Sequence, residues 1–231
     1  LILRTALLAA VGIMTVLWIP RDMPIPKVSE LPISTPGITG IHFTLPLLCM
    51  LGSVGGLTAI MSQVETYWLP AIKALAPASA NGLLGVLSAT SFFLLTLGSV
   101  AMGRLKIKSK QGRWNVYFAM QIMLCVIVMI LARQKTLAGF GAAYLIFYLV
   151  IGADDVQEQT LLNSLADSGN RAATISASSL AGQMGGFVAS AYGAMTVVGL
   201  GINGMWQLLG GAVAVVFAIL WLATLLSRKN L

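Results

Sequence analysis

The sequence has little charge. Only 9% of its 231 residues are Asp, Glu, Lys or Arg, whereas a soluble domain carries about 25%, and 58% are hydrophobic. A chain of this composition lacks the polar surface that a soluble domain needs, so we predict an integral membrane protein. The formal net charge of +7 says little about nucleic acid, because Lys and Arg of membrane proteins gather in cytoplasmic loops, and we expect no nucleic-acid partner.

Residues that carry catalytic or metal chemistry are also scarce. The single histidine excludes a multi-histidine metal site within this chain. Cys49 and Cys125 each lie in an apolar run, so we expect two buried small hydrophobic residues rather than a disulfide or a metal pair. The glycines of GINGMW and GQMGG lack the strand–turn–helix context of a dinucleotide site. We therefore predict no cofactor, no metal and no enzymatic activity.

Long apolar runs dominate the sequence instead. A membrane helix needs roughly 20 mostly apolar residues. We predict an all-α membrane protein with seven transmembrane helices, at residues 3–19, 41–66, 81–103, 114–132, 136–156, 172–197 and 204–227. The chain then divides into residues 1–40, a helix and a Pro-rich loop, and residues 41–231, a six-helix bundle. Because the chain starts at Leu1 and no cleavage pattern follows the first span, we expect a true membrane helix of a longer protein.

One loop sets the orientation. Five cations and no anion stand in GRLKIKSKQGRW: Arg104, Lys106, Lys108, Lys110 and Arg113. Such a loop stays in the cytoplasm. Alternation of the spans then places the C-terminus and the segment Asp154–Arg171 in the cytoplasm as well. It also puts Arg133 and Lys135 outside, which is an exception to the rule that cations gather in cytoplasmic loops.

The span 172–197 is rich in small residues. Residues four apart share a face of a helix. Two adjacent ridges result, Ala173, Ala177, Ala181, Gly185, Ala189 and Gly193 beside Thr174, Ser178, Gly182, Gly186, Ser190 and Ala194. Small residues let membrane helices approach closely. The face either packs statically or slides when the protein changes shape, and the two interpretations are compatible.

Arg171 stands at the start of this span, where the helix dipole favours anions rather than cations. We predict that it pairs with Asp154, Asp155, Glu158 or Asp167, or meets a lipid phosphate. The alternative is a solvated arginine at the interface.

Polar residues inside membrane spans usually face a cavity or a partner. The cavity-side candidates are Glu65 and Trp68 in and after span 41–66, Tyr144, Tyr148 and Asp155 along span 136–156, and Gln183 in span 172–197. The alternatives are a wet interfacial acid, an aromatic belt and tyrosine–backbone hydrogen bonds. For Asn115 and Gln121 we expect hydrogen bonds between helices.

A family resemblance adds to these observations. NRAATISASSLAG resembles the Arg-Ala-Thr-x-x-Ser-x-x-Ser-Leu stretch that opens the eleventh helix of many major facilitator superfamily transporters, with Ala173 as an extra residue. The order of a helix, a loop and six helices, with the basic loop after the second of the six, is similar to helices 6 to 12 of that family. The basic loop departs from the family signature, because Gly103 takes the place of its acid.

The resemblance implies the C-terminal half of a secondary transporter. Such proteins move a small solute by rocking two six-helix bundles around a midplane site; coupling to protons stays open. The implied partners are the bilayer, a small-molecule substrate and an N-terminal half, in a bacterial plasma membrane. Arg104, Asp154, Glu158 and Arg171 are candidates for cytoplasmic ion pairs or a gate. The alternative is a non-transporting membrane scaffold, an assembly subunit or a truncated remnant.

Overall fold

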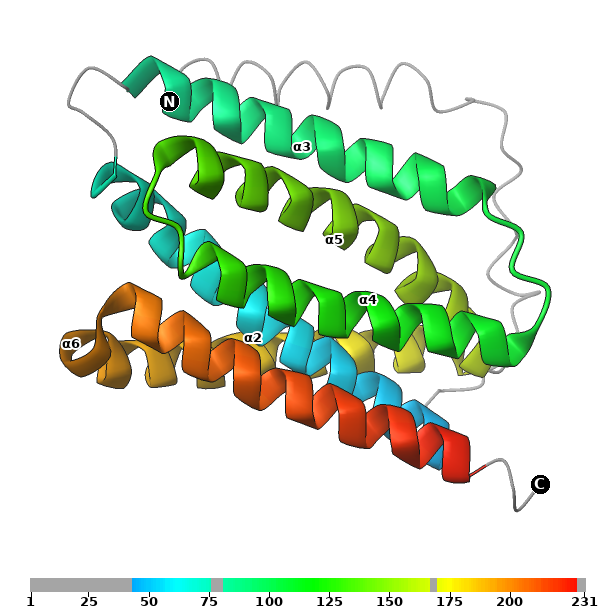
Figure 1. The fold of residues 1–231 in the computed structure, drawn as a ribbon. Helices are drawn as coiled ribbons and strands as arrows, with labels where there is room; N and C mark the ends of the chain where they lie inside the picture. Colours follow the sequence, from blue (N-terminus) through cyan, green and yellow to red (C-terminus); the bar gives the residue numbers. More distant parts are fainter. Residues whose placement is uncertain (1–42, 76–80, 167–169, 228–231) are drawn as a thin grey trace, which may run out of the picture. The chain divides into compact units, whose positions relative to one another are not determined.

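The computed structural model describes residues 43–75, 81–166 and 170–227. The chain divides into two units, Leu1–Thr35 and Pro36–Leu231, and all described residues belong to the second. Five α-helices form the regular structure of these residues: α2 (Leu45–Lys73), α3 (Asn81–Arg104), α4 (Lys110–Leu131), α5 (Leu137–Leu165) and α6 (Arg171–Leu226) (Figure 1). Each is long and apolar enough to cross a membrane. The prediction of an all-α membrane protein is therefore confirmed.

The prediction of seven separate helices is not confirmed. The first span and the segment 1–40 lie outside the described residues. The last two predicted spans, 172–197 and 204–227, fall within the single helix α6, which doubles back at a break inside it. The loop expected between them is reduced to one residue.

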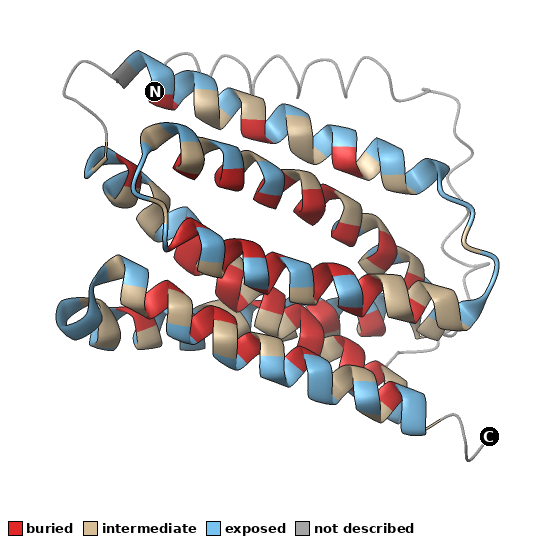
Figure 2. Cartoon of the chain, in the orientation of Figure 1, coloured by how far each residue is buried: buried red, intermediate tan, exposed pale blue. Residues whose placement is uncertain are grey.

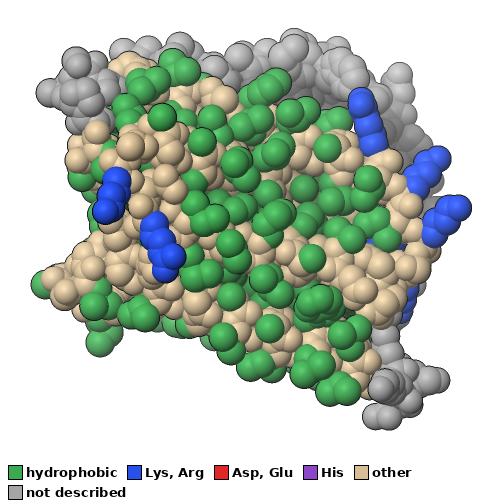
Figure 3. Space-filling view, in the orientation of Figure 1, with side chains coloured by type: hydrophobic (Ala, Val, Ile, Leu, Met, Phe, Trp, Pro, Cys, Tyr) green, Lys and Arg blue, Asp and Glu red, His purple; other side chains and the backbone are tan. Residues whose placement is uncertain are grey.

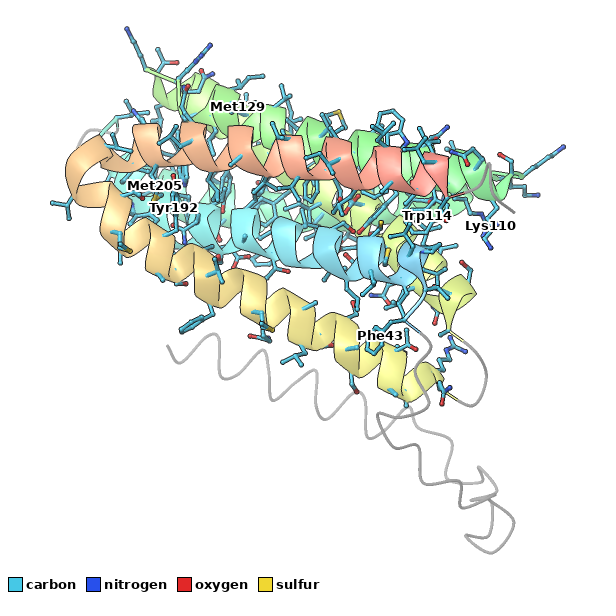
Figure 4. All side chains as sticks on the ribbon, turned by 90° about the horizontal axis from the view of Figure 1, so that it is seen from below. Phe43, Lys110, Trp114, Met129, Tyr192 and Met205 are labelled. Carbon is cyan, nitrogen blue, oxygen red and sulfur yellow. The ribbon has the colours of Figure 1, made fainter. Side chains whose placement is uncertain are left out.

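That residue is Gly201, with φ 65° and ψ 174°. Only glycine adopts this backbone conformation readily. It divides α6 into a first arm, residues 171–200, and a second arm, residues 202–226. Seen from below, the arms join near Tyr192 and Met205 and pass on either side of α2 (Figure 4).

Gly201→Ala should lower the free energy of unfolding by about 1–3 kcal/mol, because a Cβ is strained in this conformation. Thermal unfolding in detergent measures the change. Gly199→Ala is the matched control, since Gly199 is helical and a Cβ there meets nothing within 4 Å. Equal unfolding temperatures in the two variants would contradict the assigned role of Gly201.

Helix α5 is longer than predicted. It runs on to Leu165, whereas the hydropathy pattern predicts an end at residue 156, directly after the first two acids. Gln and Glu are good helix formers, so a polar segment need not end a helix. Asp154 lies within α5 as predicted, and Glu158, expected just beyond its end, belongs to the helix as well.

Two helix pairs account for most of the packing. Helix α2 packs along α6, and α3 packs along α5. Glycine brings each pair close: a Cβ on Gly185 would collide with the carbonyl of Gly55, and a Cβ on Gly152 with the carbonyl of Leu95. Ser99 Oγ also donates to Gly152 O, at 2.8 Å. Backbone contact at small residues is the usual way in which membrane helices associate.

Buried aromatic rings fill the interior between α4, α5 and the second arm of α6. Trp114 stacks on Phe118 with ring centroids 5.9 Å apart, and Phe140 lies 6.3 Å from Trp206. Figure 2 shows the buried positions concentrated on these inner faces, whereas α3 is mostly exposed. On the face shown in Figure 3, hydrophobic side chains cover the described helices along their length, and the described Lys and Arg stand towards the two ends. This distribution suits a bundle surrounded by lipid.

Candidate functional site: a polar cleft beside a buried carboxyl

A cleft of about 240 Å³ opens between α2, α5 and the first arm of α6. Its polar lining residues are Thr58, Glu158, Gln159, Ser178, Ser179 and Gln183. Helix geometry explains this convergence. Ser179 and Gln183 lie one turn apart on the first arm, while Thr58 stands near the middle of α2.

The exposed polar side chains of this cleft cannot face hydrocarbon without a large cost. Ser179 and Gln183 are exposed, and Glu158 is half-buried. An ionisable or amide group that faces lipid is costly, so such groups in membrane helices face water, a cavity or another protein. The cleft is therefore a surface that water or a partner covers.

A second polar group lies deeper on α5. Asp154 is 0% exposed, and neither carboxylate oxygen has a hydrogen-bond partner among the described residues. About 16 Å of helix separate it from the end of α5 at Leu165. The 29 residues of α5 extend roughly 43 Å, so the helix is longer than a hydrocarbon core of about 30 Å.

Polar groups from two other helices surround Asp154. Gln121 of α4 lies beside the Asp154 carboxyl and near the Tyr117 hydroxyl, and it is itself 0% exposed. The Tyr117 hydroxyl shares a hydrogen bond of 2.8 Å with Ser53 Oγ of α2. Glu158, one turn along α5, connects this cluster to the cleft, because it lines the cleft and interacts with Asp154.

Gln121 lies between helices as predicted, because its side chain stands beside the Asp154 carboxyl of α5. The amide atoms of Gln121 and the carboxylate oxygens of Asp154 do not reach ideal hydrogen-bond geometry with each other. Asn115 does bond between helices as expected, since its Oδ1 accepts from Trp221 Nε1 of α6 at 3.1 Å. Buried amides are normally paired. The Gln121 amide and the Asp154 carboxyl therefore form a buried polar pair between α4 and α5.

Tyr144 and Tyr148 form a separate cluster with Trp68. Trp68 stacks on Tyr144 at 5.0 Å, and the two tyrosine hydroxyls are 3.4 Å apart. Both tyrosines are buried, whereas Glu65 is exposed. The tyrosines therefore join α5 to α2 rather than line the polar cleft. Asp155, predicted on the same face, is exposed and interacts electrostatically with Asp154 and Glu158.

The two arginines proposed for ion pairs lie at the exposed helix ends. Arg171 donates from Nε and Nη2 to Oδ1 of Asn163, at 3.0 and 2.7 Å. This described partner is an amide and not an acid, while Asp167 lies outside the described residues. Arg104 is exposed at the end of α3, where a cation suits the helix dipole.

The small-residue face of the first arm lies against α2. Gly182 and Ala189 are buried, and Ala177, Ala181, Gly185 and Gly186 are half-buried. The carbonyl of Ala181 lies 3.1 Å from where a Cβ of Gly55 would stand. The face is therefore in close backbone contact with a neighbouring helix.

Gln63 joins α2 to both arms of α6, a role that the predicted site does not include. Its Nε2 donates to Ala189 O at 2.8 Å, and its backbone carbonyl accepts from Trp206 Nε1 at 3.4 Å. A Cβ on Gly193 would collide with Gln63 Oε1, so the glycine makes room for the amide. A glutamine within an apolar span is itself a signal of an interhelical hydrogen bond, and this signal could have identified the contact.

Among the described residues, no group of three or more His, Cys, Asp or Glu side chains is placed to hold a metal ion. No protein-family model, no curated protein and no solved structure matches the chain.

Proposed function

We propose that this chain is one half of a secondary transporter of the major facilitator type, which moves a small solute across the membrane. The observation that carries the proposal is the exposed polar cleft between α2, α5 and the first arm of α6, next to a buried carboxyl. A membrane bundle that needed only to be stable would have neither feature, because both are costly in lipid.

The arrangement of the helices supports the proposal. The described segments form two sets of three: α2, α3 and α4 in the first set, and α5 and the two arms of α6 in the second. Matched in order, α2 corresponds to α5 and α3 corresponds to the first arm. The pairing of α2 with the first arm then corresponds to the pairing of α5 with α3. Both pairs meet through glycine, at Gly55 and Gly185 and at Gly98 and Gly152. Helices α2 and α5 run in opposite directions (Figure 1). Inverted three-helix repeats of this kind are a feature of secondary transporters, whose substrate sites lie at the repeat interface.

The lining of the cleft favours a class of solute. It offers hydroxyl and amide groups together with one acid, Glu158, and no Lys or Arg among its described residues. Such a lining suits a small polar solute that is neutral or cationic. In this proposal the second six-helix bundle covers the cleft, and Asp154 holds the coupling proton or ion. The proposal also places the basic loop and the C-terminus in the cytoplasm of a bacterial cell.

A flux assay tests the proposal. The product of the complete gene is reconstituted in proteoliposomes and offered a panel of neutral, cationic and anionic small solutes. We expect saturable flux of a neutral or cationic solute, reduced at least tenfold by Glu158→Gln. Residues 1–231 alone should give no saturable flux.

The matched control removes a charge away from the cleft. Lys135→Gln lies in the connection between α4 and α5 and should leave the flux unchanged. If no solute moves, or if Glu158→Gln transports as the unmodified protein does, a non-transporting membrane scaffold becomes the better account.

A further inference from the structure

A pocket of about 310 Å³ lies where the loop between α3 and α4 meets α5. Lys106, Lys108 and Arg113 line it from the loop and from α4, and Gln157 lines it from α5. Figure 4 places Lys110, the first residue of α4, at the same end of the bundle.

The positive charge in this pocket is not balanced by the described residues around it. No Asp or Glu stands among its described lining residues or in the first turn of α4. The N-terminus of a helix is itself positive, so Lys110 and Arg113 in the first turn add to a field that favours an anion. Arg113 is held in place, because its Nε donates to Ile107 O at 3.3 Å.

Gln157 provides an independent observation. It is only 5% exposed, and its Oε1 has no hydrogen-bond partner among the described residues. An amide oxygen accepts hydrogen bonds, so a ligand hydroxyl that donates to Oε1 would stabilise this buried group, whereas a phosphate oxygen, itself an acceptor, would not. This residue lines the same pocket as the cations.

An apolar groove of about 330 Å³ continues from this pocket between α3 and α4, with α5 as its floor. Met102 and Leu105 line both spaces. The groove is lined almost entirely by apolar atoms, including those of Ala101, Met123 and Ala153. It stays open because α3 packs on α5 and makes few contacts with α4.

We propose that the pocket and the groove together bind one anionic glycerophospholipid, with its phosphate among Lys106, Lys108 and Arg113, a headgroup hydroxyl that donates to Gln157 Oε1, and an acyl chain between α3 and α4. A free phosphate would fill only the pocket, whereas a phospholipid fills both spaces. Basic pockets between membrane helices on the cytoplasmic side are typical sites for anionic headgroups. The inference does not depend on the proposed transport activity.

Native mass spectrometry of the delipidated full chain tests the site, with phosphatidylglycerol and phosphatidylcholine as probes. We expect phosphatidylglycerol to bind at least tenfold more tightly. Each cation near an anionic surface raises the binding affinity by a factor of about five. The triple variant Lys106→Gln/Lys108→Gln/Arg113→Gln should therefore bind phosphatidylglycerol about a hundredfold more weakly. Ala101→Trp, which fills the groove, should weaken the binding of both lipids.

Two controls distinguish this site from nonspecific charge attraction and from a phosphate site. Arg133→Gln/Lys135→Gln removes two cations from the other end of α4 and should leave phosphatidylglycerol binding unchanged. Inorganic phosphate at 100-fold excess should not displace the lipid. Equal binding of the two lipids, full binding by the triple variant, equal loss in the control variant or displacement by phosphate would each overturn the proposal.

Discussion

Asp154→Asn should abolish solute flux by the complete gene product while the protein remains folded. The carboxyl is fully buried within a membrane helix and has no hydrogen-bond partner among the described residues. A buried charge without a partner is among the most expensive groups in a membrane protein. Asn keeps the size of the side chain and removes the charge, so the unfolding temperature should stay equal or rise. Flux should fall at least a hundredfold.

Asp154→Glu and Ser164→Ala complete this experiment. Asp154→Glu retains the carboxyl and should keep part of the flux. Ser164→Ala lies on the same helix, where the hydroxyl donates to Leu161 O, and should behave as the unmodified protein. Unchanged flux in Asp154→Asn would remove Asp154 from the mechanism, whereas a lower unfolding temperature would show that the carboxyl is structural.

Gly152→Ala should disrupt the pairing of α3 and α5. A Cβ at this position collides with the backbone carbonyl of Leu95, which has no flexible end that can move aside. The two helices must separate, and they then lose the hydrogen bond from Ser99 to Gly152 O. Overpacking of this kind costs about 1–3 kcal/mol or more. We expect a much lower unfolding temperature in detergent, or aggregation during purification.

Gly141→Ala provides the control on the same helix. A Cβ there lies 3.6 Å from Leu87 Cδ1, an ordinary contact with the end of a flexible side chain. Because alanine is the better helix former, the unfolding temperature should not fall. Similar unfolding of the two variants would mean that α3 and α5 do not cross at Gly152.

The sequence predicts the apolar helices well, because hydropathy over about 20 residues is a strong signal. It predicts their ends less well. The acids after residue 153 suggest an end of α5 at residue 156, yet the helix continues to Leu165. The turn of α6 at Gly201 is shorter than the expected loop, since a single glycine gives little signal among many others.

The candidate site is predicted only in part. Glu158 and Gln183 stand out in the sequence by their polarity, and both line the cleft. The burial of Asp154 beside Gln121 has no such signal, because it depends on which face of α5 meets α4. That choice is made by close packing at glycines such as Gly152, which leaves no periodic pattern in an evenly apolar helix.

Cysteine labelling tests most directly whether one face of α6 meets water inside the membrane, on which the proposed transport depends. Cys49 and Cys125 are buried, so the background is low. Two variants are compared, Gln183→Cys in the cleft and Leu180→Cys on the same helix. Each is treated with a membrane-impermeant maleimide in right-side-out and in inside-out vesicles. We predict rapid labelling at position 183 from at least one side and none at position 180, an exposed leucine outside the lining of the cleft that we expect to face lipid. Equal labelling at both positions, or none at position 183 from either side, would contradict a water-filled cleft.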